Sequence, residues 1–169
     1  MHQQIRTLQK VVTRKGNSKA LTFSMPHVLK SIFVLSNQKY VSRASFCKEL
    51  HMGEGAVRTL IAHLKELDLV DSIKAGTFLT HKGRKFASRF SAIIPSQTFL
   101  KKCCLTNGKH NCAILLNNEH IDDIGNGMQQ RDFAILYGAS DSLTLIFRDG
   151  EFVFSGDQMR CFADELKIR

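Results

Sequence analysis

Residues 41–90 carry the pattern that most restricts how this chain can fold. Ser42 is a candidate helix cap, and Val41 and Phe46 stand on either side of it at the spacing of a hydrophobic staple. The segment HMGEG then marks a tight turn. The next helix is expected over residues 53–67, with Val57, Leu60, Ile61, Leu64 and Leu67 on one face. The pattern therefore predicts a short helix, a turn and a longer amphipathic helix.

Two short β-like runs, LVDSIK and TFLTH, follow this second helix. Gly76 lies between them and can supply the positive φ that a tight hairpin turn requires. Thr80 is a candidate cap for a further helix that Pro95 ends, while Ser24 and Pro26 suit the start of an earlier helix over residues 26–37. Helices around a tight turn, followed by a hairpin and an exit helix, predict a winged helix-turn-helix.

Residues 95–169 predict a second, smaller domain with the element order β-α-β-β-α. The expected strands are residues 111–117, 142–147 and 151–155, and the expected helices are residues 126–137 and 157–168. A strand, a crossover helix and a strand imply a parallel pair. Asp149-Gly150 predicts a hairpin between the last two strands. The fold class expected for the whole chain is α+β.

We therefore expect three parts. Residues 1–25 form a basic N-terminal arm, residues 26–94 the winged helix-turn-helix, and residues 95–169 a C-terminal domain that senses an effector or dimerises. Within the arm, QQIRTLQKVV is compatible with a short helix or a strand. A basic arm can follow phosphates, and a poorly ordered terminus is the alternative.

The two parts of the chain differ in charge. Residues 1–100 hold 16 Lys and Arg against 5 Asp and Glu, a formal charge of +11. Residues 101–169 hold 8 Lys and Arg against 10 Asp and Glu, a formal charge of −2. Such asymmetry favours a polyanion as partner of the N-terminal part, although a solvated basic surface explains the charge alone equally well.

In a winged helix-turn-helix the second helix enters the major groove of DNA, which is about 12 Å wide, and its polar face contacts bases. Arg58 is the leading candidate, since a guanidinium can bind both acceptors of a guanine, and Glu54 can accept from cytosine N4. The other candidate DNA-binding residues are Thr59, Lys74, Thr77, Lys82, Arg84 and Lys85. Alternatively, Arg58 pairs with Glu54 four residues earlier, and the basic residues of the exit helix are simply solvated.

The segments GEGAVRTLIAHLKE and GNGMQQRDFAILYGASDSLTLIFRDGEFVFSGD resemble a family of archaeal proteins of unknown function, in which a winged helix precedes a small α/β domain. The matching residues of the second segment are Gly127, Gln130, Arg131, Asp132, Ala134, Ile135, Gly138, Ala139, Thr144, Leu145, Asp149, Gly150, Gly156 and Asp157. The likeness covers most of residues 26–157 and departs from the family at Ser155, where a proline is usual. It implies this fold and a role in transcription regulation, but no ligand.

Arg131 allows two interpretations. It can bind an anionic effector near the helix start at Asn126 and Gly127, where free N–H groups point outward. Asn126, Gly127 and Arg131 are therefore the candidate effector-binding residues. The favoured alternative is structural, with Arg131 paired to a carboxylate or a carbonyl.

The sequence offers little support for catalysis. It contains no P-loop, GxSxG, HExxH or dinucleotide-binding motif, so we expect neither an enzyme nor a cofactor. Cys103, Cys104, His110 and Cys112 cluster in the sequence without a standard zinc spacing. Metal binding and redox sensing stay open for this cluster, beside buried or idle thiols.

The sequence thus predicts a transcription regulator that binds double-stranded DNA sequence-specifically. A homodimer is expected because dimers of such proteins gain half-site specificity, and a small-molecule effector is compatible with the C-terminal domain. The chain has neither an apolar N-terminal segment nor a membrane-length apolar run, so we expect a cytoplasmic protein. The alternative is a winged-helix adaptor that docks on the transcription or translation machinery without reading DNA.

Overall fold

The computed structural model describes residues 2–13, 21–101, 105–106, 108–156 and 159–161. The chain divides into two compact units, Met1–Ser91 and Ala92–Arg169. Within the described ranges, helices combine with small antiparallel strand pairs, so the fold is of the α+β class. No helix in these ranges has both the length and the apolar character needed to cross a membrane.

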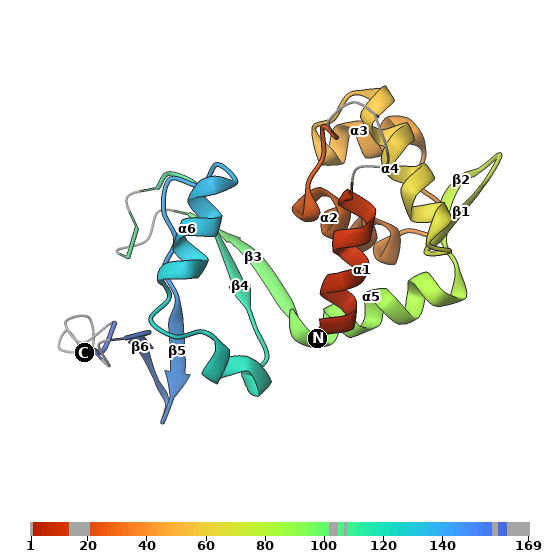
Figure 1. The fold of residues 1–169 in the computed structure, drawn as a ribbon. Coiled ribbons are helices and arrows are strands. Elements are labelled where there is room, and N and C mark those ends of the chain that lie inside the picture. The colour runs from red at the N-terminus through yellow and green to blue at the C-terminus, as the bar shows by residue number, and fades with distance from the viewer. Residues whose placement is uncertain (1, 14–20, 102–104, 107, 157–158, 162–169) are drawn as a thin grey trace. The chain divides into compact units, whose positions relative to one another are not determined.

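The first unit is a cluster of helices with one β-hairpin (Figure 1). Its elements are α1 (His2–Val12), α2 (Met25–Asn37), α3 (Arg43–Leu50), α4 (Glu54–Glu66), β1 (Val70–Ile73), β2 (Gly76–Leu79) and α5 (His81–Ile93). The order from α2 to α5 is the one that the sequence predicts. The hairpin β1–β2 projects beside α4, and its strands pair antiparallel from Val70↔Leu79 to Ile73↔Gly76.

The predicted helix caps are present, with Ser24 at the N-cap of α2 and two further caps that bond through their hydroxyls. The Ser42 hydroxyl accepts a hydrogen bond from the Ser45 backbone N–H at 3.0 Å and so satisfies a donor in the first turn of α3. The Thr80 hydroxyl accepts from the Gly83 N–H at 3.0 Å and donates to the Asp68 carbonyl at 2.6 Å. Thr80 therefore starts α5 and also ties it to the end of α4.

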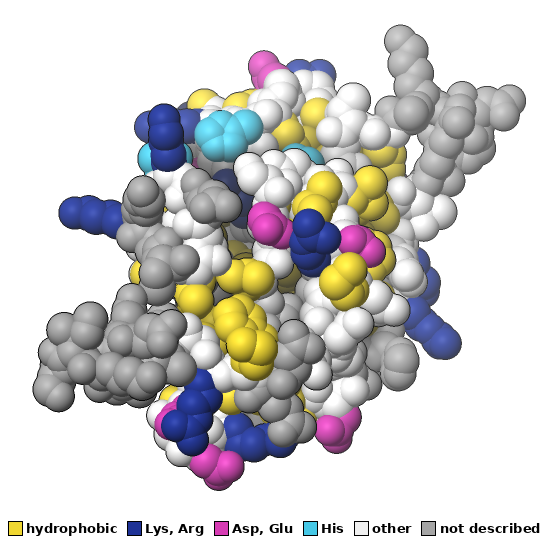
Figure 2. Space-filling model, turned by 90° about the vertical axis from the view of Figure 1, so that its left-hand side faces the viewer, with side chains coloured by type: hydrophobic (Ala, Val, Ile, Leu, Met, Phe, Trp, Pro, Cys, Tyr) yellow, Lys and Arg dark blue, Asp and Glu magenta, His cyan; other side chains and the backbone are white. Residues whose placement is uncertain are grey.

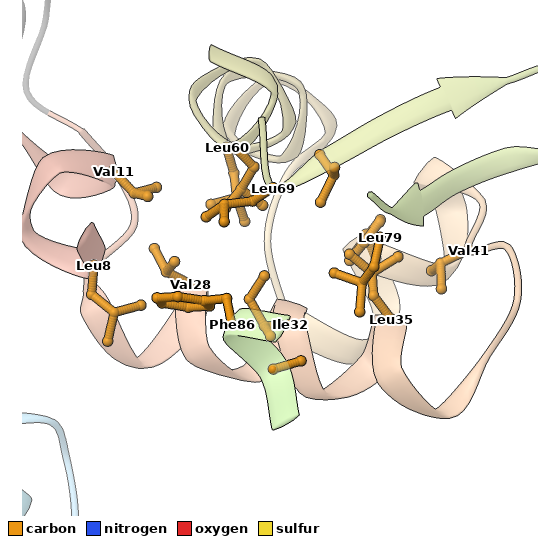
Figure 3. Packing of buried hydrophobic residues seen from close by; sticks show 14 of the residues in the cluster. Leu8, Val11, Val28, Ile32, Leu35, Val41, Leu60, Leu69, Leu79 and Phe86 are labelled. Carbon is orange, nitrogen blue, oxygen red and sulfur yellow. The ribbon is translucent and has the colours of Figure 1, made fainter. Parts of the chain in front are cut away.

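The core of the first unit is formed by apolar side chains from every one of its helices and from the hairpin (Figure 3). Val28 and Ile32 of α2, Leu60 of α4 and Phe86 of α5 meet there. The same cluster contains Leu8 and Val11 of α1, so the segment expected as a basic arm is in part a packed helix. The basic turn at residues 14–20 lies outside the described residues.

The hairpin is fixed to the segment before α3. Val41 and Thr77 exchange two backbone hydrogen bonds, each 2.9 Å long. They form an isolated antiparallel bridge, so Val41 lies beside β2 in the manner of a one-residue strand. Gly76 has φ +140°, as predicted, and a Cβ there would lie 2.8 Å from the Val41 carbonyl oxygen. A side chain at residue 76 would therefore separate the hairpin from α3.

The second unit contains two antiparallel sheets of two strands each among its described residues. Its elements are β3 (Ser96–Leu100), β4 (Asn111–Leu115), the 3-10 helix η1 (Asn118–Asp123), α6 (Met128–Leu136), β5 (Leu145–Arg148) and β6 (Glu151–Phe154). The β5–β6 hairpin has the register Arg148↔Glu151 around the predicted turn. Asp149 and Gly150 both have positive φ there, at 52° and 83°.

The predicted parallel pair was wrong. The strand at residues 111–115 pairs antiparallel with β3, from Ser96↔Leu115 to Leu100↔Asn111, and not with the strand after α6. The sequence interpretation missed β3 because SQTFL is short and follows Pro95 directly. In the expected last helix, Arg160 instead forms an isolated bridge to Val153. The rest of that expected helix lies outside the described residues, apart from Met159 and Cys161.

Gly83 generates a first prediction, because α5 passes directly over the backbone of Leu69. A Cβ at residue 83 would overlap the Leu69 carbonyl oxygen and lie 2.9 Å from its carbon. We expect Gly83→Ala to lower the free energy of unfolding by about 3 kcal/mol, since relieving the overlap moves backbone. Thermal and urea unfolding, followed by circular dichroism, measure this change.

Gly55→Ala is the matched control, since no heavy atom lies within 4 Å of a Cβ at that position in α4. Alanine favours a helix over glycine by up to about 1 kcal/mol, so this variant should be as stable as the wild type or more stable. Equal destabilisation by the two substitutions would contradict the close packing of α5 on Leu69.

Candidate nucleic-acid interface

Helix α4 has one buried face and one exposed face. Val57, Leu60 and Leu64 are almost completely buried and seat the helix in the core. Glu54, Arg58 and Thr59 are exposed. The predicted residues of this helix therefore lie together on its outer side, where a polyanion can reach them.

Glu54 joins α4 to α3 through two arginines. Its Oε1 atom lies 3.1 Å from an Nη atom of Arg58 and 3.2 Å from an Nη atom of Arg43. The pairing of Arg58 with Glu54 is the alternative that their spacing of four residues indicated. Arg43 was missed by the sequence interpretation, because its nearness to Glu54 depends on how the turn between α3 and α4 folds. These three side chains are called the Arg-Glu-Arg cluster below.

The cluster is exposed, with side-chain accessibilities of 56% for Arg43, 61% for Glu54 and 69% for Arg58. The hydrogen bond from Arg58 is the main reason why the pKa of the Glu54 carboxyl lies below its ordinary value, and the bond from Arg43 is the next. Glu54 is therefore ionised at neutral pH, and the cluster carries one net positive charge. One Glu54 oxygen is already occupied by both donors, so it is not free to accept from a cytosine.

The other predicted DNA-binding residues around the hairpin differ in accessibility. Thr59 is exposed, and its hydroxyl donates to the Gly55 carbonyl at 3.1 Å. Lys74 is exposed at the hairpin tip. Thr77 is 4% exposed, and its hydroxyl lies 3.1 Å from that of Ser72, so the structure does not favour the predicted contact of this side chain with DNA. Its side chain points into the unit because its backbone pairs with Val41.

Two of the three predicted cations of α5 hold backbone carbonyls. The Lys82 ammonium donates to the Leu67 carbonyl at 2.7 Å, where α4 ends. The Arg84 guanidinium donates to the Leu79 carbonyl at 2.8 Å. Both residues therefore stabilise the packing of α5 on its neighbours, a role that spacing in the sequence does not indicate. Lys85 is exposed and stays a candidate phosphate contact.

The candidate effector residues have structural partners. The Asn126 side chain accepts from the Met128 N–H at 3.1 Å at the start of α6. Gly127 is buried, and a Cβ there would lie 2.5 Å from the Ser155 hydroxyl. Arg131 donates to Asp141 at 2.7 Å, which raises the pKa of its guanidinium. These contacts favour the structural interpretation of all three residues over an effector site.

The cysteine and histidine cluster is only partly described. His110 and Cys112 are exposed, and Cys112 lies on β4. Cys103 and Cys104 lie outside the described residues. Metal binding and redox sensing at this cluster stay open alternatives to buried or idle thiols.

The geometry of Glu54 yields a titration test. The pKa of Glu54 should rise toward its ordinary value in Arg58→Ala, and by a smaller step in Arg43→Ala, because the Arg58 hydrogen bond is the larger cause. Because the pKa of Glu54 is lower in the folded chain than in the unfolded chain, the cluster stabilises the fold at pH values above the unfolded-state pKa. This contribution is lost as the pH falls through the folded-state pKa.

The measurement is an NMR titration of the Glu54 carboxyl carbon in the wild type and both variants. The Asp141 carboxyl serves as internal reference, since its pKa is lowered mainly by Arg131 and not by the cluster. An unchanged Glu54 pKa in Arg58→Ala would rule out the observed pairing in solution.

Both units match family models of uncharacterised proteins. Residues 24–85 match the family described as PH0730-like, N-terminal domain. Residues 107–168 match a family described as a domain of unknown function, DUF4443. No curated protein matches the chain.

Among solved structures, the chain is similar to the hypothetical protein PH0730 from Pyrococcus horikoshii OT3. The TM-score is 0.64 and the sequences are 27% identical, over 83% of this chain and 70% of that chain. The expected resemblance to archaeal proteins of unknown function is thereby confirmed, for the N-terminal and the C-terminal parts alike.

Proposed function

We propose that this protein is a transcription regulator that binds duplex DNA sequence-specifically through a winged helix-turn-helix. Helices α3 and α4 supply the helix-turn-helix, and the hairpin β1–β2 supplies the wing. In this arrangement α4 lies in the major groove, Arg58 contacts base edges and Lys74 contacts the backbone or the minor groove beside the wing. The C-terminal unit brings a second function, which is to associate copies or to sense an effector.

The observation that carries the proposal is the Arg-Glu-Arg cluster on the exposed side of α3 and α4. Two guanidinium groups from different helices lie within 3.2 Å of one carboxylate oxygen, so both arginines are held at the same edge of the unit. A guanidinium that pairs with a carboxylate has the planar donor geometry that also fits phosphate or guanine. On this account DNA replaces Glu54 as the partner of at least one arginine.

The charge of the first unit supports a polyanion as the partner. Residues 1–91 hold 16 Lys and Arg against 5 Asp and Glu, whereas residues 92–169 hold 8 against 10. A cationic unit beside a nearly neutral one steers a nucleic acid to one part of the chain.

The proposal is tested with Arg58→Ala and Arg43→Ala in a salt series of fluorescence anisotropy on duplex DNA. We expect Arg58→Ala to weaken binding to a selected site about tenfold or more, and to reduce discrimination against altered sites. Arg43→Ala should weaken binding to all duplexes alike and reduce the log–log salt slope by about 1, as expected for a phosphate contact.

Arg89→Ala is the matched control, because it removes the same charge from an exposed position on α5, outside the cluster. It should change affinity far less than either cluster variant. If the wild type binds no duplex even at low salt, the proposal fails. The alternative function, a winged-helix adaptor of the transcription or translation machinery, would then explain the positive charge. Docking of the adaptor on its protein partner should survive Arg58→Glu.

Glu54→Gln tests the role of the carboxylate separately. Removing its charge frees both guanidinium groups, so we expect tighter binding to random-sequence duplex and a salt slope that is steeper by about 1. The ratio of specific to non-specific affinity should fall, since the carboxylate no longer competes with non-specific duplex for the two guanidinium groups. Weaker binding to every duplex would instead mean that Glu54 itself holds the DNA, and would contradict its proposed role as a competitor.

A further inference from the structure

The second unit has no buried apolar core among its described residues. Each hydrophobic side chain that is buried in the described chain belongs to residue 90 or to an earlier position. The second unit instead exposes large apolar side chains, among them Phe99 at 83% and Leu136 at 74%. Figure 2 shows hydrophobic side chains coming to the surface between charged ones on one face of the molecule. Large exposed apolar surfaces are typical of interaction sites.

The β3–β4 ribbon has the clearest surface of this kind. Its register places Phe99 opposite Cys112 and Gln97 opposite Ile114, and residues that are opposite in an antiparallel pair point to the same side. We call these four side chains the Phe99 face. All of them are exposed, and none is charged. A two-stranded ribbon with an uncovered apolar face is at best marginally stable in water, so a covering surface would stabilise it.

The area of this surface fits a dimer interface. Phe99, Ile114 and Leu116, which follows β4 directly, are 83%, 56% and 47% exposed. Together with Cys112 they present on the order of 400 Å² of apolar surface, given that a large side chain buries roughly 150–250 Å². A standard interface buries about 800 Å² per partner, of which about 65% is apolar in homodimers. The Phe99 face and the adjoining Leu116 together therefore supply most of the apolar area that a dimer needs.

The charges favour a second copy of this chain as the occupant. An uncharged face meets its own copy without repulsion across a two-fold axis, whereas it offers no ionic complement to an acidic or a basic partner. The second unit has a formal charge of −2 against +11 for the first. The proposed interface thus lies on the unit that carries little net charge.

We propose that two copies of this chain form a symmetric dimer by packing the Phe99 faces of their β3–β4 ribbons against each other. The proposal does not rest on DNA binding, because neither the face nor its area depends on the Arg-Glu-Arg cluster. Dimerisation would nevertheless place two copies of α4 in one particle.

The test is the mass of the full chain in solution, from sedimentation equilibrium over a concentration series. The wild type should have twice the chain mass of 19.1 kDa. Phe99→Asp combined with Ile114→Asp should shift the dissociation constant upward by at least 100-fold and give the monomer mass, because it buries like charges against each other. Phe99→Ser, which removes the ring without adding charge, should weaken the dimer in the same direction.

Ile73→Asp is the matched control, since it places the same charge on a half-exposed isoleucine at the hairpin of the first unit. This variant should remain a dimer, and circular dichroism should show equal secondary structure in all variants. A monomeric wild type, or a dimer that survives the double substitution, would overturn the proposal. Arg58→Ala should leave the mass unchanged, so loss of DNA binding and loss of the dimer are measured separately.

Discussion

The burial of the apolar face of α4 is the interaction on which the arrangement of the first unit depends. Val57, Leu60 and Leu64 fix the rotation of the helix about its axis, because turning it would expose them and bury charged side chains. With that rotation fixed, Glu54 and Arg58 can only face solvent. The position of the candidate DNA-binding surface thus follows from the packing behind it, and the hairpin is set beside it by the backbone pairing of Val41 with Thr77.

Much of the first unit could be predicted because its signals are local. Caps such as Ser42 and Thr80, a turn glycine and helical spacing each involve residues close together in the chain. Arg43 could not be found in this way, since it meets Glu54 across 11 positions. The buried Thr77 and the carbonyl contacts of Lys82 and Arg84 fall in the same class, because each depends on a tertiary neighbour.

The second unit was predicted less well for a related physical reason. Its hairpins are short, its described residues bury no apolar core, and a short strand can pair with either of two neighbours at similar free energy. Helix α6 and the β5–β6 hairpin were foreseen. The Asp141 partner of Arg131 is of one of the two kinds that the structural interpretation left open. The pairing of β4 was not foreseen, because its partner is β3, whose sequence SQTFL has only two large apolar residues. Without a core to select a register, the sequence pattern alone does not decide between a local antiparallel partner and a distant parallel one.

The two units therefore carry different kinds of surface, and this division constrains how the chain can act. An exposed ion-pair cluster in water contributes little to folding, so Arg43, Glu54 and Arg58 are poorly explained as stabilisers of the first unit. An uncovered apolar ribbon likewise does not stabilise a monomer. Both features gain an explanation when the chain has partners: a polyanion for the basic unit, and a second copy for the apolar face. A single recognition helix contacts few base pairs, whereas two helices held in one particle contact two half-sites and multiply their specificity. If both proposals hold, an apolar association surface on the nearly neutral unit would turn DNA binding by one unit into more selective binding by the pair.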